Sequence, residues 1–468
     1  KRVPPSRIAP EVSPVPARPP AGRRRFRPQV IANLEDILRQ QADVDRRRMR
    51  AIADAWQLYE GQAPPPLKRR DGKPDDNVIL NLAGLIVDAG VDFLFGEDLV
   101  IDVGGEADAG ELDFALGLAW GDDLRMVRLQ QLATNGAVAG QAVVRIHGGE
   151  RDGAQVAPRV IVLDPGTLSV VTDPDDEEVV LAYVLDWRAR RDRRRQIIQP
   201  EGAGWLITDQ KAVAGTEAWQ PLGETMWDFD WPPIVAAQNL PRPNCWWGRP
   251  DLTADVIATQ DAVNRSLSTA NRLARLHGHP KPWAKGIGPD QELSGEPDEV
   301  IVLPDGDSEL GQLQPAANIS EHLELYRAVK AALHEISRVP EIAGGRLDNI
   351  GQLSGLALRI LYGPLVRKTQ TKRRLYGSLI AEASRRVLDL IGAGPDHDVT
   401  LRWPEILPSD PVEEAQAAEA KQRAGVSRAT TLGEMGYDAQ EEEAKRGEEK
   451  SADGESLMAA FNGGREQP

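Results

Sequence analysis

The chain has 468 residues, of which 72 are acidic and 56 basic, and a formal net charge of −16 at pH 7. A chain longer than about 250–300 residues divides into more than one structural region, and 41% hydrophobic residues support folded cores. The negative charge argues against a protein that wraps nucleic acid tightly, although it leaves room for local basic patches.

The cysteine count and the apolar runs narrow the class of protein further. The single cysteine, Cys245, excludes an intramolecular disulfide and a cysteine-cluster metal site, and we expect a packed thiol beside Trp246 and Trp247. No run approaches the roughly 18 consecutive apolar residues of a membrane span, and the N-terminus lacks the apolar stretch of a signal peptide. We therefore expect a soluble chain that is not secreted.

The N-terminal region predicts an arm followed by helices. Residues 1–29 are rich in proline and arginine without a hydrophobic period, which is typical of a disordered or extended arm. Apolar residues then recur at helical spacing between Leu34 and Tyr59, and we interpret the basic run Arg46 to Arg48 as a solvent-exposed face. Two further helices are predicted over 82–96 and 124–132.

Residues 141–237 predict a mainly antiparallel sheet. Short β-branched or alternating runs such as "QAVVRIH", "RVIVLD", "LSVVTD" and "EEVVLAYVLDW" are separated by Gly, Pro and Asp. With helices on both sides, the expected fold class is α+β. The arginine cluster from Arg188 to Arg195 falls between two such runs. We interpret it as a solvent-exposed hairpin tip, with nucleic-acid contact as the alternative.

A helix, an insert and a returning helix follow the sheet region. Pro250 begins a pattern whose apolar stripe continues to 277, and a helix of this length would form a rod of about 40 Å. Residues 278–319 lose the pattern and contain one expected strand, "DEVIVLP". A second helix is predicted over 320–339.

The remainder of the chain predicts a loop and more helices. Residues 340–353 form a glycine-rich loop, and a long helix runs from Ser354 to Ile391. Gly363 and Pro364 lie inside this helix, where the missing N–H and the proline ring should cause a kink. Beyond it, an acidic, alanine-rich region predicts short helices, one of them capped by Ser427.

No catalytic constellation stands out. The chain lacks a phosphate-binding P-loop, a nucleophile elbow and a His-Glu-x-x-His helix. His277 and His279 suggest a metal site only weakly, because no third ligand is near and Gly278 breaks the helix face. We interpret paired carboxylates, such as Asp75 with Asp76, as chance neighbours, and "DPDD" at 173–176 as a turn. We therefore predict no enzyme activity, no cofactor and no metal site.

Several stretches carry a family resemblance. "WQLYEGQ" and "NVILNLAGLIVDAGVDFLFGED" suggest a helix, a Tyr-x-Gly turn and an Asn-led helix. The most specific stretch runs from "PPIVAAQNLPRPNCWWGRPD" into "LTADVIATQDAVNRSLSTANRLARLHGHPKPWAKG". "GQLSGLALRILYGPLVRKTQ" begins the long helix. In this order, over about residues 30–445, the chain resembles the portal proteins of tailed bacteriophages, in particular those of phages with long non-contractile tails.

The resemblance implies a portal-type architecture with named parts. These would be an arm (1–29), a wing of helices and antiparallel sheet (30–249), two stem helices (250–277 and 320–339) flanking a small α/β clip (278–319), a tunnel loop (340–353), a long kinked wing helix with a strand (354–407), a helical crown (408–450) and a tail (451–468).

The resemblance also implies a function. The chain would form a homo-oligomeric ring, typically a dodecamer, at one capsid vertex of the virion, after assembly in the host cytoplasm. Double-stranded DNA would pass through the ring during packaging and ejection. The other implied partners are the terminase packaging motor, the scaffold and major capsid proteins and the head–tail adaptor, with no membrane.

Three groups of candidate site residues follow from this mapping. The tunnel-loop neighbours of DNA would be Gly344, Gly345, Arg346, Asn349 and Gln352; the stem contacts between subunits Asp261, Asn264, Arg265, Ser268 and Arg272; and the partner-binding residues of the clip Lys281, Trp283 and Lys285.

Three other classes of protein are compatible with parts of the sequence. The first is another head-assembly component, such as a minor capsid protein, against which the order of helix, insert and helix argues. The second is a metal-dependent nuclease that uses the abundant carboxylates. The third is a nucleic-acid-binding regulator that uses the basic arm.

Overall fold

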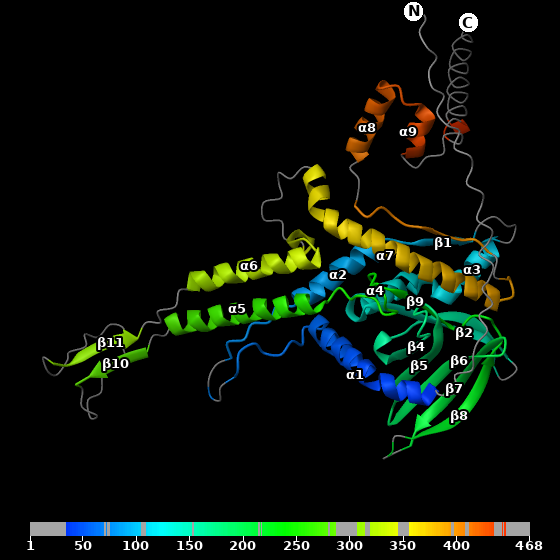
Figure 1. Cartoon of the computed structure of the whole chain (residues 1–468). Helices are drawn as coiled ribbons and strands as arrows, with labels where there is room; N and C mark the ends of the chain where they lie inside the picture. Colours follow the sequence, from blue (N-terminus) through cyan, green and yellow to red (C-terminus); the bar gives the residue numbers. More distant parts are fainter. Residues whose placement is uncertain are drawn as a thin grey trace, which may run out of the picture. The chain divides into compact units, whose positions relative to one another are not determined.

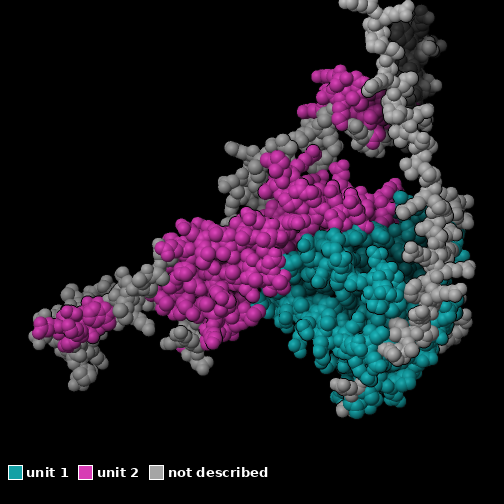
Figure 2. Space-filling view, in the orientation of Figure 1, with its two compact units in different colours: residues 1–63, 103–253, 375–400 teal, residues 64–102, 254–374, 401–468 magenta. Residues whose placement is uncertain are grey.

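A computed structural model describes most of the chain as two compact units. The described residues are 34–69, 72, 75–103, 109–151, 154–213, 216, 218–278, 281–286, 307–313, 319–344, 355–394, 397–407, 411–434, 442 and 444–445. Unit 1 comprises residues 1–63, 103–253 and 375–400, and unit 2 comprises residues 64–102, 254–374 and 401–468 (Figure 2). The mixture of helices and antiparallel sheets confirms the predicted α+β class.

Unit 1 contains two antiparallel sheets and their covering helices (Figure 1). Its described helices are α1 (Leu34–Tyr59), α3 (Ala109–Trp120) and α4 (Arg125–Ala139), with the short turns η1 (Asp122–Leu124) and η2 (Pro165–Thr167). Its strands are β2 (Gln141–Arg151), β3 (Ala154–Val162), β4 (Leu168–Thr172), β5 (Val180–Ala189), β6 (Asp192–Glu201), β7 (Gly204–Ala212), β8 (Trp219–Trp227) and β9 (Ile234–Gln238). The sheet orders are β3-β2-β9 and β4-β5-β6-β7-β8.

The five-stranded sheet is buried on both faces at its centre, which explains the continuous apolar run in β5. Tyr183 and Leu185 face a core that includes Val143 of β2 and Ile234 of β9. The alternate residues of β5 and its neighbours face a second core, to which α1 contributes Leu34. Because successive side chains point to opposite faces, a strand with two covered faces has no polar side and loses the alternating pattern.

Two elements of unit 1 are not predicted by the sequence pattern. Helix α3 leaves Phe114 and Leu118 exposed, so its apolar residues do not follow one helical face. Strand β8 is exposed along nearly its whole length and contains Pro221 and Gly223, both unfavourable in strand interiors. Neither element buries one clear face, and therefore neither shows the periodic pattern of apolar residues that predicts a helix or a strand.

The interpretation of Arg46 to Arg48 as a solvent-exposed face is wrong for Arg48. Its guanidinium lies 3.6 Å from the ring centroid of Trp247, and its Nη1 donates to the carbonyl of Pro165 at 3.1 Å. Burial lowers the pKa of Arg48, mainly by desolvation. The long aliphatic stem lets one arginine of a basic run turn inward, because its five N–H donors can satisfy carbonyls in the interior.

A buried polar cluster joins α4, the residue that follows β9 and the second half of helix α7 (Gly355–Leu390) inside unit 1. The hydroxyl of Tyr376 donates to Oδ1 of Asn239 at 3.0 Å, and both residues are fully buried. A Cβ placed on Gly136 would lie 1.9 Å from that hydroxyl. The α4 residue facing Tyr376 therefore has to be glycine.

The β5–β6 hairpin turns through a strained residue. Ala189 pairs with Asp192, so Arg190 and Arg191 form the turn, and Arg190 has φ of +59°. This left-handed conformation costs a non-glycine residue about 1–2 kcal/mol. Replacing Arg190 with Gly should therefore raise the midpoint of thermal unfolding. The matched change at Arg191, which is not in that conformation, should lower it or leave it unchanged, and equal effects at both positions would contradict the assignment.

Unit 2 contains a helical hairpin and smaller elements. They are α2 (Leu82–Phe95), α5 (Ala254–Gly278), β10 (Lys281–Lys285), β11 (Glu309–Leu313), α6 (Ile319–Ser337), η3 (Glu341–Gly344), the first part of α7, α8 (Pro411–Arg423) and α9 (Arg428–Glu434). Helices α5 and α6 lie side by side, and β10 pairs with β11 (Figure 1). The short strands β1 (Val100–Val103) and β12 (Val399–Arg402) form a further two-stranded sheet.

The element boundaries in this part of the chain differ slightly from the predicted ones. Helix α5 begins at Ala254 and not at Pro250, because Asp251 still donates its backbone N–H to the carbonyl of Ala137. Helix α7 continues through Pro364. Ser427 caps α9, accepting from the N–H of Thr430 at 3.2 Å, as predicted. The expected strand "DEVIVLP" and Ser354, the predicted first residue of the long helix, lie outside the described residues.

Candidate functional site

A row of polar side chains on α5 binds an extended segment of the same unit. Gln260, Asn264 and Ser268 recur every four residues, so they share one face of the helix, and all three are buried. They contact residues 76–80, which belong to no helix or strand. We call these six α5 side chains the polar row: Gln260, Asn264, Ser268, Asn271, Arg272 and Arg275.

The polar row supplies hydrogen bonds that a neighbouring strand would otherwise supply. Gln260 donates to the carbonyl of Leu80 at 2.7 Å, and the N–H of Leu80 donates to Asn264 at 2.9 Å. One turn further on, the N–H of Val78 donates to Oγ of Ser268 at 2.9 Å. Since buried backbone groups need partners, this row explains how an extended segment can lie on a helix.

At the C-terminal end of the polar row, two arginines form ion pairs with one aspartate, and we call this group the ion-pair clamp. Asp76 is 4% exposed and accepts from Nε of Arg275 at 2.6 Å and from Nε of Arg272 at 3.0 Å. These bonds, led by that from Arg275, lower the pKa of Asp76 from 3.8 to about 2. The interpretation of Asp75 and Asp76 as chance neighbours is therefore wrong for Asp76, whose carboxylate joins two parts of the fold.

The predicted stem residues divide into two groups. Asn264 and Ser268 are buried within the subunit, so the structure gives them an internal role in place of the predicted contact with a neighbouring subunit. Arg272 is one-third exposed and pairs with Asp76. Asp261 and Arg265 are exposed on α5, and their contact with another subunit stays a prediction. Sequence reasoning missed Gln260 and Arg275, although the four-residue spacing of the row was visible.

The end of α6 is fixed by the buried face of α7. Lys368 donates to the carbonyl of Ser337 at 3.2 Å, which places a cation at the negative end of the helix. The ring nitrogen Nδ1 of His334 lies 3.0 Å from the carbonyl oxygen of Val339 and therefore donates to it. The chain that leaves α6 toward the predicted tunnel loop thus starts from a fixed position.

The predicted tunnel-loop residues are mostly outside the described part of the chain. Gly344 is the last residue of η3. Gly345, Arg346, Asn349 and Gln352 lie in the range 345–354, outside the described residues, so their proximity to DNA stays a prediction.

The predicted clip residues lie on the β10–β11 hairpin. Trp283 is 39% exposed, and its ring packs over Gly311 on the opposite strand, where a Cβ would come within 2.7 Å of the indole nitrogen. Lys285 lies 3.7 Å from Glu309 in an exposed pair. Lys281 begins β10. The hairpin thus presents one large aromatic side chain, and a larger residue at Gly311 would require the Trp283 ring to shift.

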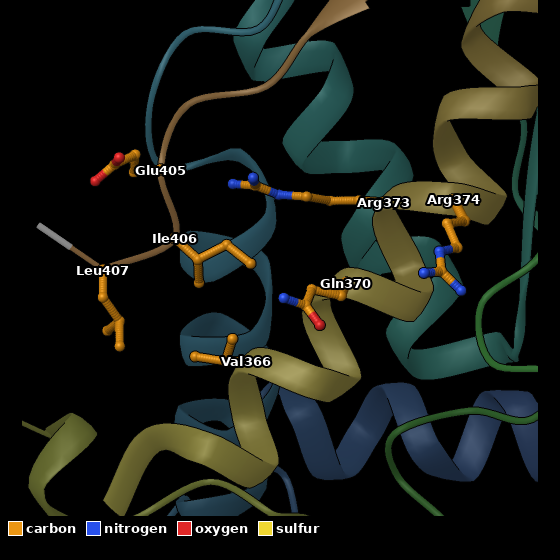
Figure 3. Close-up of a pocket in the computed structure, with 7 residues that line it drawn as sticks. All are labelled: Val366, Gln370, Arg373, Arg374, Glu405, Ile406 and Leu407. Carbon is orange, nitrogen blue, oxygen red and sulfur yellow. The ribbon is translucent and has the colours of Figure 1, made fainter. Parts of the chain in front are cut away.

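One cavity is lined by α7 and by the segment after β12, both in unit 2. Its volume is about 580 Å³, and Figure 3 shows the side chains around it. The guanidinium of Arg373 reaches across to the carbonyl of Pro404 at 2.5 Å and lies 5.0 Å from the ring centroid of Trp403. The lining residues are Val366, Gln370, Arg373, Arg374, Glu405, Ile406 and Leu407. The lining thus combines two arginines, one glutamate and one glutamine with three apolar side chains.

Neither a metal cluster nor a membrane span occurs among the described residues. No group of three or more His, Cys, Asp or Glu side chains within the described ranges could hold a metal ion. His279, the second histidine of the weak metal suggestion, lies outside them. In the same part of the chain, no helix is both long and apolar enough to cross a bilayer.

Comparison with known proteins shows the family to which the chain belongs. Residues 206–456 match the family described as phage portal protein, SPP1 Gp6-like. This stretch is more than half of the chain and includes the polar row, the β10–β11 hairpin and α7. The chain belongs to this family of phage portal proteins. No curated protein matches it.

Solved structures of low sequence identity are also similar. One is described as the neck of an empty GTA particle, with 14% identity, a TM-score of 0.47, and coverage of 76% of this chain and 90% of that one. A second is the virion of a native gene transfer agent particle, with 15% identity, a TM-score of 0.48, and coverage of 83% and 98%. A third, the neck of a native GTA particle, has 13% identity, a TM-score of 0.46, and coverage of 76% and 89%.

Proposed function

We propose that twelve identical copies of this chain close into a ring at one vertex of a virion. The number twelve is taken from the resemblance to portal proteins. The observation that carries the proposal is the surface of α6. Its partner α5 turns its polar row toward the same subunit, yet α6 leaves Leu323, Leu325 and Ile336 exposed. Heterologous contacts between copies would bury these apolar side chains and close the ring.

A charge placed on this surface should prevent ring closure. Leu325 is 51% exposed, so Leu325→Glu can be tolerated in a single subunit but would bury a carboxylate between copies. Negative-stain images of the purified wild-type protein should show rings with a central hole, and the variant should give smaller species.

The control changes a similar residue elsewhere. Val44→Glu introduces the same charge at an exposed apolar position of α1 and should leave rings intact. Compact monomers for the wild type, or rings for Leu325→Glu, would contradict the proposal.

The ring would serve as a conduit for double-stranded DNA during packaging and ejection. A wall with many Lys or Arg contacts to phosphate would bind DNA tightly, whereas translocation favours a neutral or weakly repulsive wall. The net charge of −16 supports such a wall. Arg346, Asn349 and Gln352 would be the nearest neighbours of DNA, and Gly344 and Gly345 would let their loop move.

The β10–β11 hairpin would dock the terminase packaging motor and later the head–tail adaptor. Exposed Trp283 supports this role, because tryptophan is enriched among residues that dominate binding energy. Lys281 and Lys285 would add charge to the contact. ATP hydrolysis would belong to the motor, so the chain itself would have no catalytic role and need no cofactor. Scaffold and major capsid proteins would contact the ring during assembly.

A further inference from the structure

The β5–β6 hairpin concentrates positive charge on an acidic chain. Within eight consecutive positions it carries six arginines and one aspartate. The arginines are Arg188, Arg190, Arg191, Arg193, Arg194 and Arg195. We call residues 186–195 the arginine hairpin. Its composition is opposite to that of the whole chain, which has a net charge of −16.

Half of these arginines are neutralised inside unit 1. Arg193 pairs with Asp186 at 2.5 Å, and Arg194 lies 3.8 Å from Asp192. Arg195 is buried and pairs with Glu35 of α1. These three arginines therefore have structural partners.

The other three arginines face solvent. Arg188, Arg190 and Arg191 are exposed, and none of them makes an ion pair with the residues that the structure describes. They lie within four consecutive positions at the hairpin end, with Arg188 on β5 and with Arg190 and Arg191 in the turn. The sequence interpretation of a solvent-exposed tip is correct for these residues, but it does not explain why all three are cationic.

This arrangement is unfavourable for the isolated subunit. Arg188 lies directly opposite Arg193 in the antiparallel pairing, and like charges in such cross-strand pairs destabilise a sheet. Arg190 adds left-handed strain at the turn. Asp186 compensates Arg193, whereas no described residue forms an ion pair with Arg188, Arg190 or Arg191. An uncompensated and strained tip is the pattern expected where function competes with stability.

Aromatic rings accompany the charge. Trp187 is 38% exposed and stands next to Arg188. Trp219 on β8 packs under Arg195, whose guanidinium lies 4.4 Å from its ring centroid. The hairpin is therefore packed against β8 through Arg195, while the free arginines extend from its end.

We propose that the arginine hairpin binds the phosphate backbone of double-stranded DNA, outside the conduit proposed above. Three exposed arginines without ion-pair partners at one hairpin end favour a dense polyanion, and duplex DNA carries one charge about every 1.7 Å of its axis. A two-stranded ribbon also fits the major groove, and each guanidinium can bind phosphate with two hydrogen bonds. The inference does not depend on ring formation.

The test measures binding of a fluorescently labelled 30-base-pair duplex by anisotropy between 50 and 200 mM salt, using the full chain. Each lost phosphate contact reduces the slope of log K against log salt by about 0.9, so R188A/R190A/R191A should reduce it by about 2.7. Affinity at 0.1 M salt should fall by about 500-fold, because a slope difference of about 2.7 amounts to about 2.7 log units between 1 M salt, where the electrostatic contribution vanishes, and 0.1 M salt. The lysine version, R188K/R190K/R191K, keeps the charges and should retain most of the slope.

A matched control shows whether DNA binding depends on the arginine hairpin itself or only on the net charge of the protein. R47A/R50A/R242A removes three exposed arginines elsewhere in unit 1 and should change the slope much less than the hairpin variant. Equal slopes for the wild type and the hairpin variant would overturn the proposal. So would equal competition by poly-glutamate, which would assign the site to acidic proteins, or a loss of oligomers with unchanged DNA binding, which would assign it to subunit contacts.

Discussion

Asp76→Asn should lower the free energy of unfolding by about 1–2 kcal/mol at neutral pH. This range is below the value that the pKa shift alone would give, because Arg272 and Arg275 are one-third exposed and water screens the ion pairs. The carboxylate has a pKa of about 2 in the fold against an ordinary value of 3.8. Its stabilising contribution is therefore present above pH 3.8 and is lost as the pH falls toward 2. The midpoint of thermal unfolding, measured from pH 7 down to acid, should show the difference between wild type and variant shrinking over that interval.

Asp75→Asn is the matched control for this prediction. Asp75 is adjacent in sequence but partly exposed, and its ion pair is with Arg69, not with the helix. Its replacement should have a smaller effect at neutral pH. Equal effects at the two positions, or a difference at Asp76 that persists unchanged at pH 2, would show that the clamp does not hold residues 76–80 on α5.

Gly136→Ala should destabilise unit 1 by about 1–3 kcal/mol, the range for overpacking a core. The added methyl would lie 1.9 Å from the hydroxyl of fully buried Tyr376. Tyr376→Phe alone should also destabilise, because Asn239 loses its donor in the interior. The free energy of unfolding of the double variant should fall by less than the sum of the two single decreases, because Phe removes the oxygen that clashes with the added methyl group. Unfolding midpoints of all four proteins give this coupling.

Gly117→Ala tests whether the loss at Gly136 is specific. Gly117 lies in helix α3, and a Cβ there meets nothing within 4 Å. Alanine should stabilise it by about 0.5–1 kcal/mol, the usual difference in helix propensity. A loss at both glycines, or strictly additive effects of Gly136→Ala and Tyr376→Phe, would contradict the proposed contact.

The large helices could be predicted because each buries one face, and the antiparallel strands because each buries one face or, as in β5, both faces. The stripe of α5 and the alternating strands of residues 141–237 follow directly from the periods of helices and sheets. Strand β8 could not be predicted, because it is exposed on both faces and carries no period. Helix α3 was missed for the same reason, with apolar residues on more than one side.

The candidate site was harder to predict than the fold. Polar residues on α5 suggested outward contacts, yet Asn264 and Ser268 point to residues 76–80 of the same unit. A sequence shows that a polar face exists but not what covers it, particularly when the cover is about 190 residues away and lacks regular structure. The same limit applies to Asp76, whose partners Arg272 and Arg275 become visible only in three dimensions.

The polar row also fixes the position of α5 along its own axis. Its successive contacts are chemically different: an amide that donates, an amide that accepts, a hydroxyl and a pair of guanidinium groups. Sliding the helix by one turn, about 5.4 Å, would separate Gln260 from the carbonyl of Leu80 and Ser268 from the N–H of Val78. Residues 76–80 and 260–275 must therefore translate and rotate as one rigid body. Any displacement of this helix has to be accommodated by residues outside these two segments.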